Sequence, residues 1–446
     1  MKILVLLLAA ALCPAQDIAP KPIANKVDEY MQARVRLHKF MGSVLVARDG
    51  KVLVSKGYGS ANLELDVPNT PQTKFRLGSI TKQFVALATL QLEERGKLKV
   101  SDPVCQYLEN CPEAWKPVTI HHLLSHTSGI WNFTSSPDYS KQWMLPSRPA
   151  KTMEKFRDKP LEFEPGSKWS YSNSGYILLA LVLEKASGVS YEEYMQRNIF
   201  EPAGMQDSGH DTYEAVLKHR ASGYAERNGR LQNAPYHDMS IPIGGGDLYS
   251  TVEDMLRWDQ ALYSGKLAQP ESIARLFTPV KNNYGYGWTV DQQFNRTRIS
   301  HGGGINGFVT FISRYPQDKS LVVVLSNHMN ANPGVVAGDL AAILFGMPYE
   351  IAKPNVAVSV DPKLYDAYVG KYQLAPNFIL SVTRDGDRLL TQATGQGQVE
   401  IFPESETKFF LKVVEAKITF VKDSEGKVNE VILHQGGRDM PAKRVP

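Results

Sequence analysis

Ser79 and Lys82, a serine and a lysine three positions apart, are the first candidates for chemistry in this sequence. The apolar pattern after them predicts a helix from Thr81 to Arg95, and residues i and i+3 of a helix share one face. The lysine amine can therefore reach the serine hydroxyl. A serine becomes a nucleophile when a neighbouring base takes its proton, and a buried lysine whose pKa falls toward neutrality is such a base. The spacing predicts an acyl-accepting serine at the start of a helix.

The same four-residue pattern also occurs at Ser405–Lys408 and at Ser424–Lys427. Both copies lie in turn-rich sequence, where a spacing of three does not impose a shared face, and we expect them at the surface. Ser79 differs because the apolar run from Phe84 to Leu92 would bury its helix.

Tyr171 and Asn173 form the only Tyr-x-Asn string of the chain. A tyrosine beside a lysine ammonium loses its proton more easily and can relay protons to a leaving group. An asparagine can donate a hydrogen bond to a substrate carbonyl. Taken alone, the string fits a Ser- and Gly-rich turn before an apolar helix equally well.

A glycine-rich string, His301 to Gly307, comes just before an apolar run, Phe308 to Ile312. Its G-x-G-x-x-G spacing does not indicate a dinucleotide site, because a strand follows where a helix is required. Glycines at a strand edge more often mark a close approach of a ligand to the backbone. His301 alone would fit a structural role as readily as a functional one.

Together these three strings resemble the serine β-lactamase and DD-peptidase family, in its class C branch. The Ser-x-x-Lys, Tyr-x-Asn and Lys/His-x-Gly boxes occur in the family's order and at comparable spacing. Three further strings look similar to the family's: Phe75 to Gly78, His122 to Gly129, and Gly244 to Ser250. The resemblance covers about residues 25 to 345. It implies an α+β domain with an antiparallel sheet flanked by helices.

The resemblance also implies a mechanism in which Ser79 forms an acyl-enzyme, while Lys82 and Tyr171 share the general-base and general-acid roles. Backbone N–H donors of an oxyanion hole are worth about 3 kcal/mol each in barrier lowering. No metal or organic cofactor is called for. The expected oxyanion and substrate-binding residues are Asn173, His301, Gly303 and Gly304, with the N–H groups of Ser79 and Gly304 forming the oxyanion hole.

His301 stands where many family members carry a lysine. A histidine is largely neutral near pH 7, so strong recognition of a substrate carboxylate is not expected. We therefore favour a D-amino-acid peptidase, carboxypeptidase or esterase over the alternatives, a β-lactamase or a non-catalytic penicillin-binding sensor. An α/β-hydrolase and a zinc peptidase are disfavoured because the sequence has no G-x-S-x-G and no H-E-x-x-H string.

The first residues of the chain indicate an exported protein. Residues 1–15 combine Lys2 with an apolar run too short to span a bilayer, which predicts a signal peptide. A lipid anchor on Cys13 is less favoured, because Leu12 is large where a small residue normally precedes a lipid-modified cysteine. We expect a periplasmic or secreted protein whose mature chain has no transmembrane segment.

The net charge of +4, spread over the sequence, does not suggest a nucleic-acid partner. The expected partner is a small-molecule or peptide substrate, and the oligomeric state is open.

Two cysteines, Cys105 and Cys111, remain in the predicted mature chain. In an oxidising compartment they form a small-loop disulfide or stay as two unpaired thiols.

The sequence predicts two domains. Residues 16–347 form the hydrolase domain, and a proline-punctuated linker follows at 348–362. Evenly spaced short strands predict a small all-β barrel over 363–446. From Tyr368 onward this tail resembles the lipocalin-like domain appended to many such hydrolases.

Overall fold

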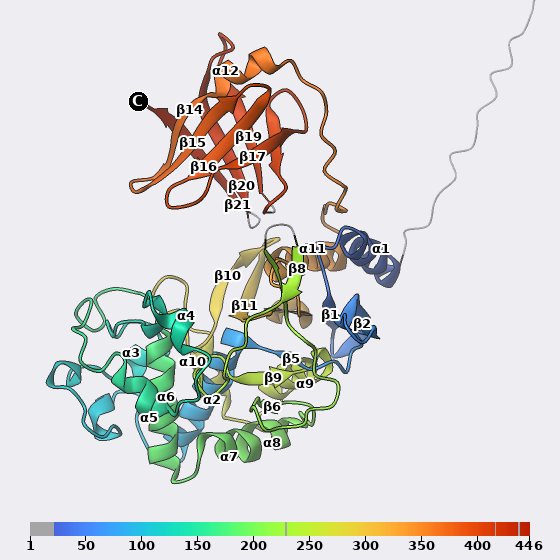
Figure 1. Ribbon diagram of the computed structural model, residues 1–446. Helices are drawn as coiled ribbons and strands as arrows, with labels where there is room; N and C mark the ends of the chain where they lie inside the picture. The colour runs from blue at the N-terminus through green and yellow to red at the C-terminus, as the bar shows by residue number, and fades with distance from the viewer. Residues whose placement is uncertain (1–21, 228–229, 415, 436–437) are drawn as a thin grey trace, which may run out of the picture.

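The computed structural model describes residues 22–227, 230–414, 416–435 and 438–446. The predicted signal peptide at 1–15, with Cys13, lies outside these residues. A larger unit is built around a six-stranded sheet, and a closed barrel, orange to red in Figure 1, follows residues 347–361, which contain no helix or strand. The predicted α+β domain followed by a small barrel is confirmed.

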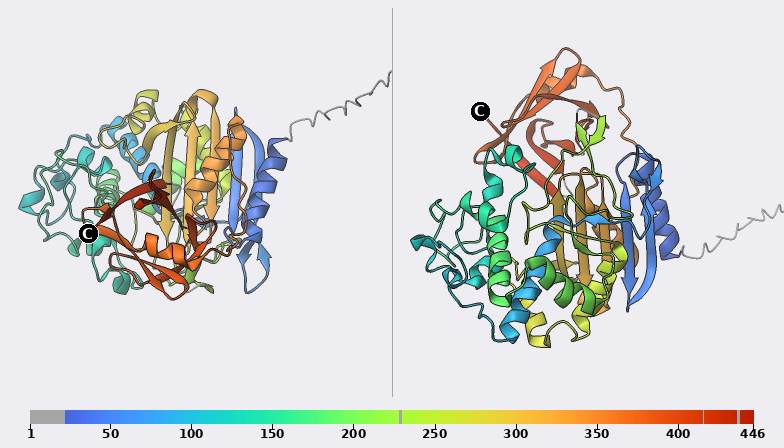
Figure 2. Two further views of the ribbon diagram at one scale, coloured as in Figure 1. Left: turned by 90° about the horizontal axis from the view of Figure 1, so that it is seen from above. Right: turned by 60° about the horizontal axis from the view of Figure 1, so that its bottom comes forward.

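The central sheet is antiparallel and combines the first strands of the chain with much later ones, in the order β10-β11-β12-β13-β1-β2. In Figure 2 the blue early strands lie beside the yellow and orange late ones. Asp49 and Gly50 form the hairpin turn between β1 and β2, as an Asp-Gly pair between two apolar runs predicts, and both have positive φ, 50° and 71°. The strands of this sheet are β1 (Gly42–Arg48), β2 (Lys51–Tyr58), β10 (Thr289–Gln293), β11 (Arg296–Ile305), β12 (Phe308–Tyr315) and β13 (Ser320–Ser326).

Side chains alternate between the two faces of the sheet along each strand, and the strand β13 is buried on both faces. In β13, Leu321 and Val323 join the larger core, whereas Val322 and Val324 join a second core that includes residues of α1 and α11.

The α-helices are α1 (Ile23–Arg36), α2 (Thr81–Glu94), α3 (Ile120–Leu124), α4 (Tyr139–Gln142), α5 (Pro149–Glu154), α6 (Asn173–Ser187), α7 (Tyr191–Met195), α8 (Glu201–Ala203), α9 (Val252–Tyr263), α10 (Pro270–Leu276), α11 (Pro333–Phe345) and α12 (Tyr365–Tyr368). The 3-10 turns are η1 (Gly78–Ile80), η2 (Val104–Gln106), η3 (Glu113–Trp115), η4 (Phe133–Ser135), η6 (Pro316–Asp318) and η7 (Pro362–Leu364), and η5 (Gln196–Phe200) is a π-helical turn.

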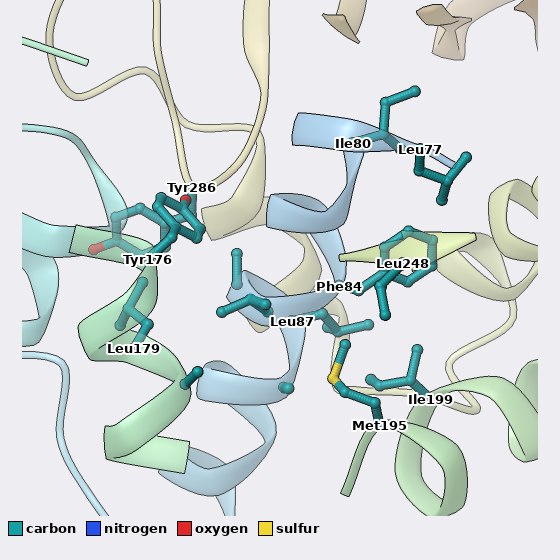
Figure 3. Packing of buried hydrophobic residues seen from close by; sticks show 14 of the residues in the cluster. Leu77, Ile80, Phe84, Leu87, Tyr176, Leu179, Met195, Ile199, Leu248 and Tyr286 are labelled. Carbon is teal, nitrogen blue, oxygen red and sulfur yellow. The ribbon is translucent and has the colours of Figure 1, made fainter. Parts of the chain in front are cut away.

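Helix α2 runs through the middle of the larger core. Every residue from Thr81 to Leu92 is buried, and the Phe84 ring lies 4.3 Å from that of Trp258. Figure 3 shows Phe84 and Leu87 enclosed by side chains from neighbouring helices. Lys82, in the first turn of this helix, is therefore fully buried.

Short strands connect this core to the segment that carries Ser79. A three-stranded sheet, in the order β5-β9-β6, lies at the start of α2. The short strands outside the central sheet and the barrel are β3 (Ser60–Asn62), β4 (Val67–Pro68), β5 (Phe75–Arg76), β6 (Gly209–His210), β7 (Tyr224–Arg227), β8 (Arg230–Asn233) and β9 (Leu248–Ser250).

The C-terminal unit is an eight-stranded antiparallel barrel that closes between its first and last strands. Its core combines aliphatic and aromatic side chains, with the rings of Tyr368 and Phe420 stacked 4.3 Å apart. The strands are β14 (Gly370–Ala375), β15 (Phe378–Asp385), β16 (Arg388–Ala393), β17 (Val399–Pro403), β18 (Lys408–Leu411), β19 (Ala416–Lys422), β20 (Val428–Gln435) and β21 (Arg438–Val445).

Cys105 and Cys111 are joined in a disulfide. Across the residues that the structure describes, no helix combines the length and the apolar character needed to cross a bilayer.

Candidate active site

Ser79 lies in the tight turn η1 between β5 and α2. The preceding Gly78 has φ +55°, and a Cβ on it would lie 2.6 Å from the backbone nitrogen of Gly304 in β11. Only glycine combines this backbone conformation with so close an approach. Ser79 is partly exposed and lines a cavity of about 70 Å³. The turn therefore presents the serine hydroxyl beside the edge of β11.

Lys82 points from the first turn of α2 back to Ser79, as the spacing predicts. Its Nζ lies 3.0 Å from Ser79 Oγ, 2.9 Å from Asn173 Oδ1 and 2.7 Å from the carbonyl oxygen of Gly245. The amide oxygen and the carbonyl can only accept hydrogen bonds. A neutral amine thus donates its two N–H groups to them, which leaves its lone pair directed at the serine hydroxyl.

The surroundings of Lys82 favour that neutral amine. The side chain is fully buried, and this burial lowers its pKa to about 7, against an opposing effect from the charge of Asp247. Near neutral pH a substantial fraction of the amine is therefore unprotonated.

Tyr171 lies against the same amine, with its ring centroid 4.9 Å from Lys82 Nζ and 4.3 Å from the His126 ring. Burial raises the pKa of Tyr171, and a hydrogen bond with Ser79 only partly offsets that rise. The phenol therefore keeps its proton near neutral pH, so it can donate that proton but is a poor base.

Asn173 begins α6 and is fixed on both sides. Its Nδ2 donates to Thr134 Oγ1 at 3.1 Å, and its backbone N–H donates to Asn132 Oδ1 at 3.0 Å. The amide oxygen is consequently the atom that faces Lys82. These hydrogen bonds distinguish the oxygen Oδ1 of the Asn173 amide from its nitrogen Nδ2.

His301, on β11, is buried and uses both of its ring nitrogens inside the protein. Nδ1 lies 2.6 Å from the carbonyl oxygen of Gly302, which can only accept, so Nδ1 carries the proton. Nε2 then accepts a hydrogen bond from the Tyr284 hydroxyl at 2.9 Å. Burial and the nearby charge of Lys82 lower the pKa of His301 to about 4. The ring is neutral and has no free N–H.

Gly303 and Gly304 continue β11 past Ser79. A Cβ on Gly303 would lie 1.9 Å from the carbonyl oxygen of Leu77, whereas one on Gly304 would meet nothing within 4 Å. The hydroxyl of Thr310 also donates to Leu77 O at 2.7 Å, which ties the two segments together. Gly303 is thus required for close packing, and Gly304 lines the cavity.

The cavity beside Ser79 is small and uncharged. Apolar and polar groups contribute to its wall alike, and the polar atoms come from backbone, hydroxyl and amide groups. Its lining residues are Ser79, Phe133, Thr134, Tyr139, Asn173, Ile177, Pro242, Gly245, Gly246, Gly304 and Ile305. In the described ranges, His, Cys, Asp and Glu side chains do not gather in threes that could hold a metal ion.

Two parts of the chain match known protein families. Residues 23–346 match the family described as Beta-lactamase, and residues 354–444 match a Domain of unknown function (DUF3471). The chain belongs to the β-lactamase family. It is a serine hydrolase, as the resemblance to the serine β-lactamase and DD-peptidase family implies.

Relatives within and around this family are similar over long stretches. The chain is 33% identical to Penicillin-binding protein 4* of Bacillus subtilis over 91% of this chain and 95% of that protein. It is 30% identical to the Teichoic acid D-alanine hydrolase of Staphylococcus aureus over 69% of this chain and 74% of that protein. Among solved structures, the octameric penicillin-binding protein homologue from Pyrococcus abyssi matches with a TM-score of 0.68 and 29% identity, over 94% of this chain and 99% of that one.

The structure brings the predicted residues into one site. Ser79, Lys82 and Asn173 are joined by hydrogen bonds, and Tyr171 lies against them. The catalytic roles given to these residues, and to His301, Gly303 and Gly304, remain predictions.

Sequence reasoning missed three groups at this site: Tyr284, His126 and the Gly245 carbonyl. His126 is buried, and its Nδ1 accepts the Ser172 N–H at 3.2 Å. His126 and Gly245 lie in strings that resemble the family's, which was the available signal, whereas no motif pointed to Tyr284.

Proposed function

We propose that this protein hydrolyses small acyl esters and amides that carry no free carboxylate, with D-alanyl derivatives as the favoured substrates, through an acyl-enzyme on Ser79. The main support is the hydrogen bonding of Lys82, whose two acceptor-only partners direct its lone pair at the serine hydroxyl. Lys82 is the general base in this proposal, and Tyr171 is the proton donor.

In the acylation step, Lys82 takes the proton of Ser79 Oγ as that oxygen attacks the substrate carbonyl carbon. The negative charge that develops on the carbonyl oxygen is held by the backbone N–H groups of Ser79 and Gly304. The proton then passes from Lys82 through the Tyr171 hydroxyl to the leaving oxygen or nitrogen as the bond to that atom breaks. The product is an ester of Ser79, and Asn173 keeps Lys82 oriented throughout.

In the deacylation step, water attacks the Ser79 ester. Lys82 and Tyr171 together accept the proton of the water and return a proton to Ser79 Oγ, and the acyl group leaves as a carboxylic acid. The lysine ends the cycle in its starting state.

The cavity supports a small acyl group that carries no carboxylate. Its volume of about 70 Å³ suits a short side chain, and no charged side chain lines it. His301 offers neither a cation nor a free N–H for a carboxylate. A D-alanyl ester fits these limits, because its side chain is a methyl group and its carboxyl group is already esterified. The staphylococcal relative is named a teichoic acid D-alanine hydrolase, which agrees with this substrate class.

β-Lactams are the second candidate, because the similar bacillary protein is named a penicillin-binding protein. Penicillins carry a carboxylate next to the ring. Without a cation at His301 we expect slow acylation by penicillins and little turnover.

A labelling experiment tests the proposal. Wild-type protein is incubated with a fluorescent penicillin and with the p-nitrophenyl ester of D-alanine, alongside Ser79→Ala and Ser405→Ala. Ser405 also precedes a lysine by three positions, but it is exposed in the turn before β18. We expect Ser79→Ala to lose ester turnover by ~10³-fold or more and Ser405→Ala to keep it. Equal turnover in wild type and Ser79→Ala would refute the proposal.

We also propose that the protein is exported, to the periplasm or the medium. The disulfide between Cys105 and Cys111 supports an oxidising compartment, as does the signal peptide predicted at residues 1–15. Mass spectrometry of the mature N-terminus from fractionated cells tests this. A cytoplasmic protein that retains Met1 would contradict it.

A further inference from the structure

Asp247 is a fully buried carboxylate that no motif assigned to the chemistry. It lies on the turn before β9, and one oxygen, Oδ1, accepts the Gly244 N–H at 2.7 Å. The same oxygen is 3.3 Å from the Tyr191 hydroxyl, and Oδ2 is 2.7 Å from His210 Nδ1. A buried carboxylate is costly unless hydrogen bonds and nearby charge compensate it, so its retention here calls for an explanation.

The turn that Asp247 fixes is the one that holds Lys82. Within it, the N–H groups of Gly245 and Gly246 both donate to Pro242 O at 2.8 Å, and the carbonyl of Gly245 accepts from Lys82 Nζ at 2.7 Å. Gly244 has φ +77°, and a Cβ on it would lie 2.5 Å from Tyr176 O. The Gly245 carbonyl shares its peptide plane with the Gly246 N–H, so the bond to Pro242 O fixes its direction, and the hydrogen bond from Gly244 to Asp247 holds the turn that carries both.

The same residue is tied to the nucleophile segment from the other side. Directly after Asp247, the Leu248 N–H donates to Thr81 Oγ1 at 3.2 Å, and the Leu77 N–H donates to Leu248 O at 2.8 Å. Asp247 therefore lies between the β9 strand that supports the Ser79 turn and the glycine turn that holds Lys82.

We propose that Asp247, held in place by His210, is a positioning residue for the general base: it holds the turn whose Gly245 carbonyl contacts Lys82. The inference rests on the proposed role of Lys82 in the reaction. Asp247 touches neither the substrate nor Ser79.

The charged groups around Lys82 and around His210, on the two sides of Asp247, are consistent with the proposal. Lys82 faces Asp247 across the turn, the rings of Tyr171 and Tyr176 at 4.9 and 5.3 Å, and the imidazoles of His126 and His301, whose pKa values its charge lowers. The negative charge in this set is that of Asp247.

At the other end, His210 faces Asp247, Tyr191, Glu192 and Asp211, and its ring lines a separate cavity of about 320 Å³. Burial acts to lower the pKa of His210, but the hydrogen bond and charge of Asp247, with the charges of Glu192 and Asp211, raise it overall.

The test compares the pH dependence of kcat/KM for an uncharged p-nitrophenyl ester in wild type, Asp247→Asn and Asp254→Asn. Asn at 247 keeps an acceptor for the Gly244 N–H and removes the charge. Asp254 is a matched control, since it is also fully buried and accepts a backbone N–H, that of Asp207 at 2.7 Å. The Asp254 carboxylate contacts Ser208 and Arg257 rather than Lys82.

We expect the acidic limb of the Asp247→Asn profile to move to lower pH by ~0.5 unit or more, because loss of a nearby negative charge lowers a lysine pKa. The Asp254→Asn limb should coincide with that of wild type. A coincident Asp247→Asn limb, or an equal shift in Asp254→Asn, would overturn the inference. If Lys82→Ala leaves Ser79 acylation unchanged, the proposed function itself fails, which is a distinct outcome.

A second pair of variants tests the positioning without relying on charge. His210→Asn can donate from Nδ2 to Asp247 as the imidazole Nδ1 does, whereas His210→Ala cannot. We expect His210→Ala to lower kcat by about tenfold with KM nearly unchanged, and His210→Asn to recover most of that loss. Equal kcat in both variants would contradict the role of His210.

Discussion

The hydroxyl of Tyr284 donates to Nε2 of His301 across 2.9 Å, while Nδ1 of the same ring donates to the carbonyl of Gly302. Both nitrogens of the imidazole are thereby used within the protein. With its pKa lowered to about 4 by burial and by the charge of Lys82, the ring is neutral at physiological pH. The position that could hold a carboxylate-binding cation instead holds a neutral ring.

The first prediction concerns this position. His301→Lys should raise kcat/KM for a D-alanyl-D-alanine peptide, whose leaving group has a carboxylate, relative to the matching D-alanyl amide. We expect a change in this ratio of about tenfold, equivalent to ~1.4 kcal/mol. Tyr284→Phe is the control, because it frees Nε2 without adding a cation. An equal change of the ratio in both variants would contradict the prediction.

The second prediction is a pH profile. Lys82 acts as a base only when it is neutral, so kcat/KM should rise with pH through about 7, the lowered pKa of its amine, and level off above it. His301 titrates near pH 4 and should not contribute to this limb. In Lys82→Arg the guanidinium stays charged, so activity should be lost at every pH measured. An acidic limb unchanged in Lys82→Arg would argue against the lysine as base.

Local features of this fold could be predicted from the sequence. The Asp49-Gly50 hairpin, the α2 helix and the barrel strands follow from short-range patterns, and the structure confirms each. The string Ser250 to Glu253 has the spacing of a capping box and predicts Ser250 as a helix cap, but α9 is capped by Thr251, whose hydroxyl accepts from the Asp254 N–H at 3.1 Å. The error of one residue arises because Ser250 and Thr251 have equivalent side chains for this purpose.

Contacts made by the tertiary fold could not be predicted in the same way. Ser79 and Lys82 are three residues apart, so helix geometry alone brings them together. Tyr284 meets His301 only because the sheet places β11 beside the segment before β10, and Asp247 reaches the site through backbone hydrogen bonds of a turn. Such pairings depend on strand register and on turn conformation, which leave no periodic pattern in the sequence.

The third prediction concerns the disulfide. Cys105→Ser should lower the free energy of unfolding by about 2 kcal/mol, because the bridge restricts a short loop in the unfolded chain. Thermal melting with and without a reducing agent measures this. Reduced wild type should melt with the variant, and a variant that melts with oxidised wild type would contradict the prediction.

The fourth prediction compares two adjacent glycines of β11. Ala at 303 would place its Cβ 1.9 Å from Leu77 O, so either β11 or the segment before Ser79 must move. Overpacking of this kind costs about 1–3 kcal/mol, and here it also displaces the nucleophile turn. Gly303→Ala should therefore lower both the melting temperature and the rate of Ser79 acylation.

Gly304→Ala is the matched control for this comparison, since its Cβ would meet nothing within 4 Å. Its melting temperature should equal that of wild type, because neither its packing nor its backbone N–H is altered. If the two variants melt at the same temperature, the close approach of Gly303 to Leu77 does not constrain the nucleophile turn. If only Gly303→Ala is destabilised, the glycine of the third box is required for packing against the nucleophile segment, and its neighbour remains free to serve the oxyanion.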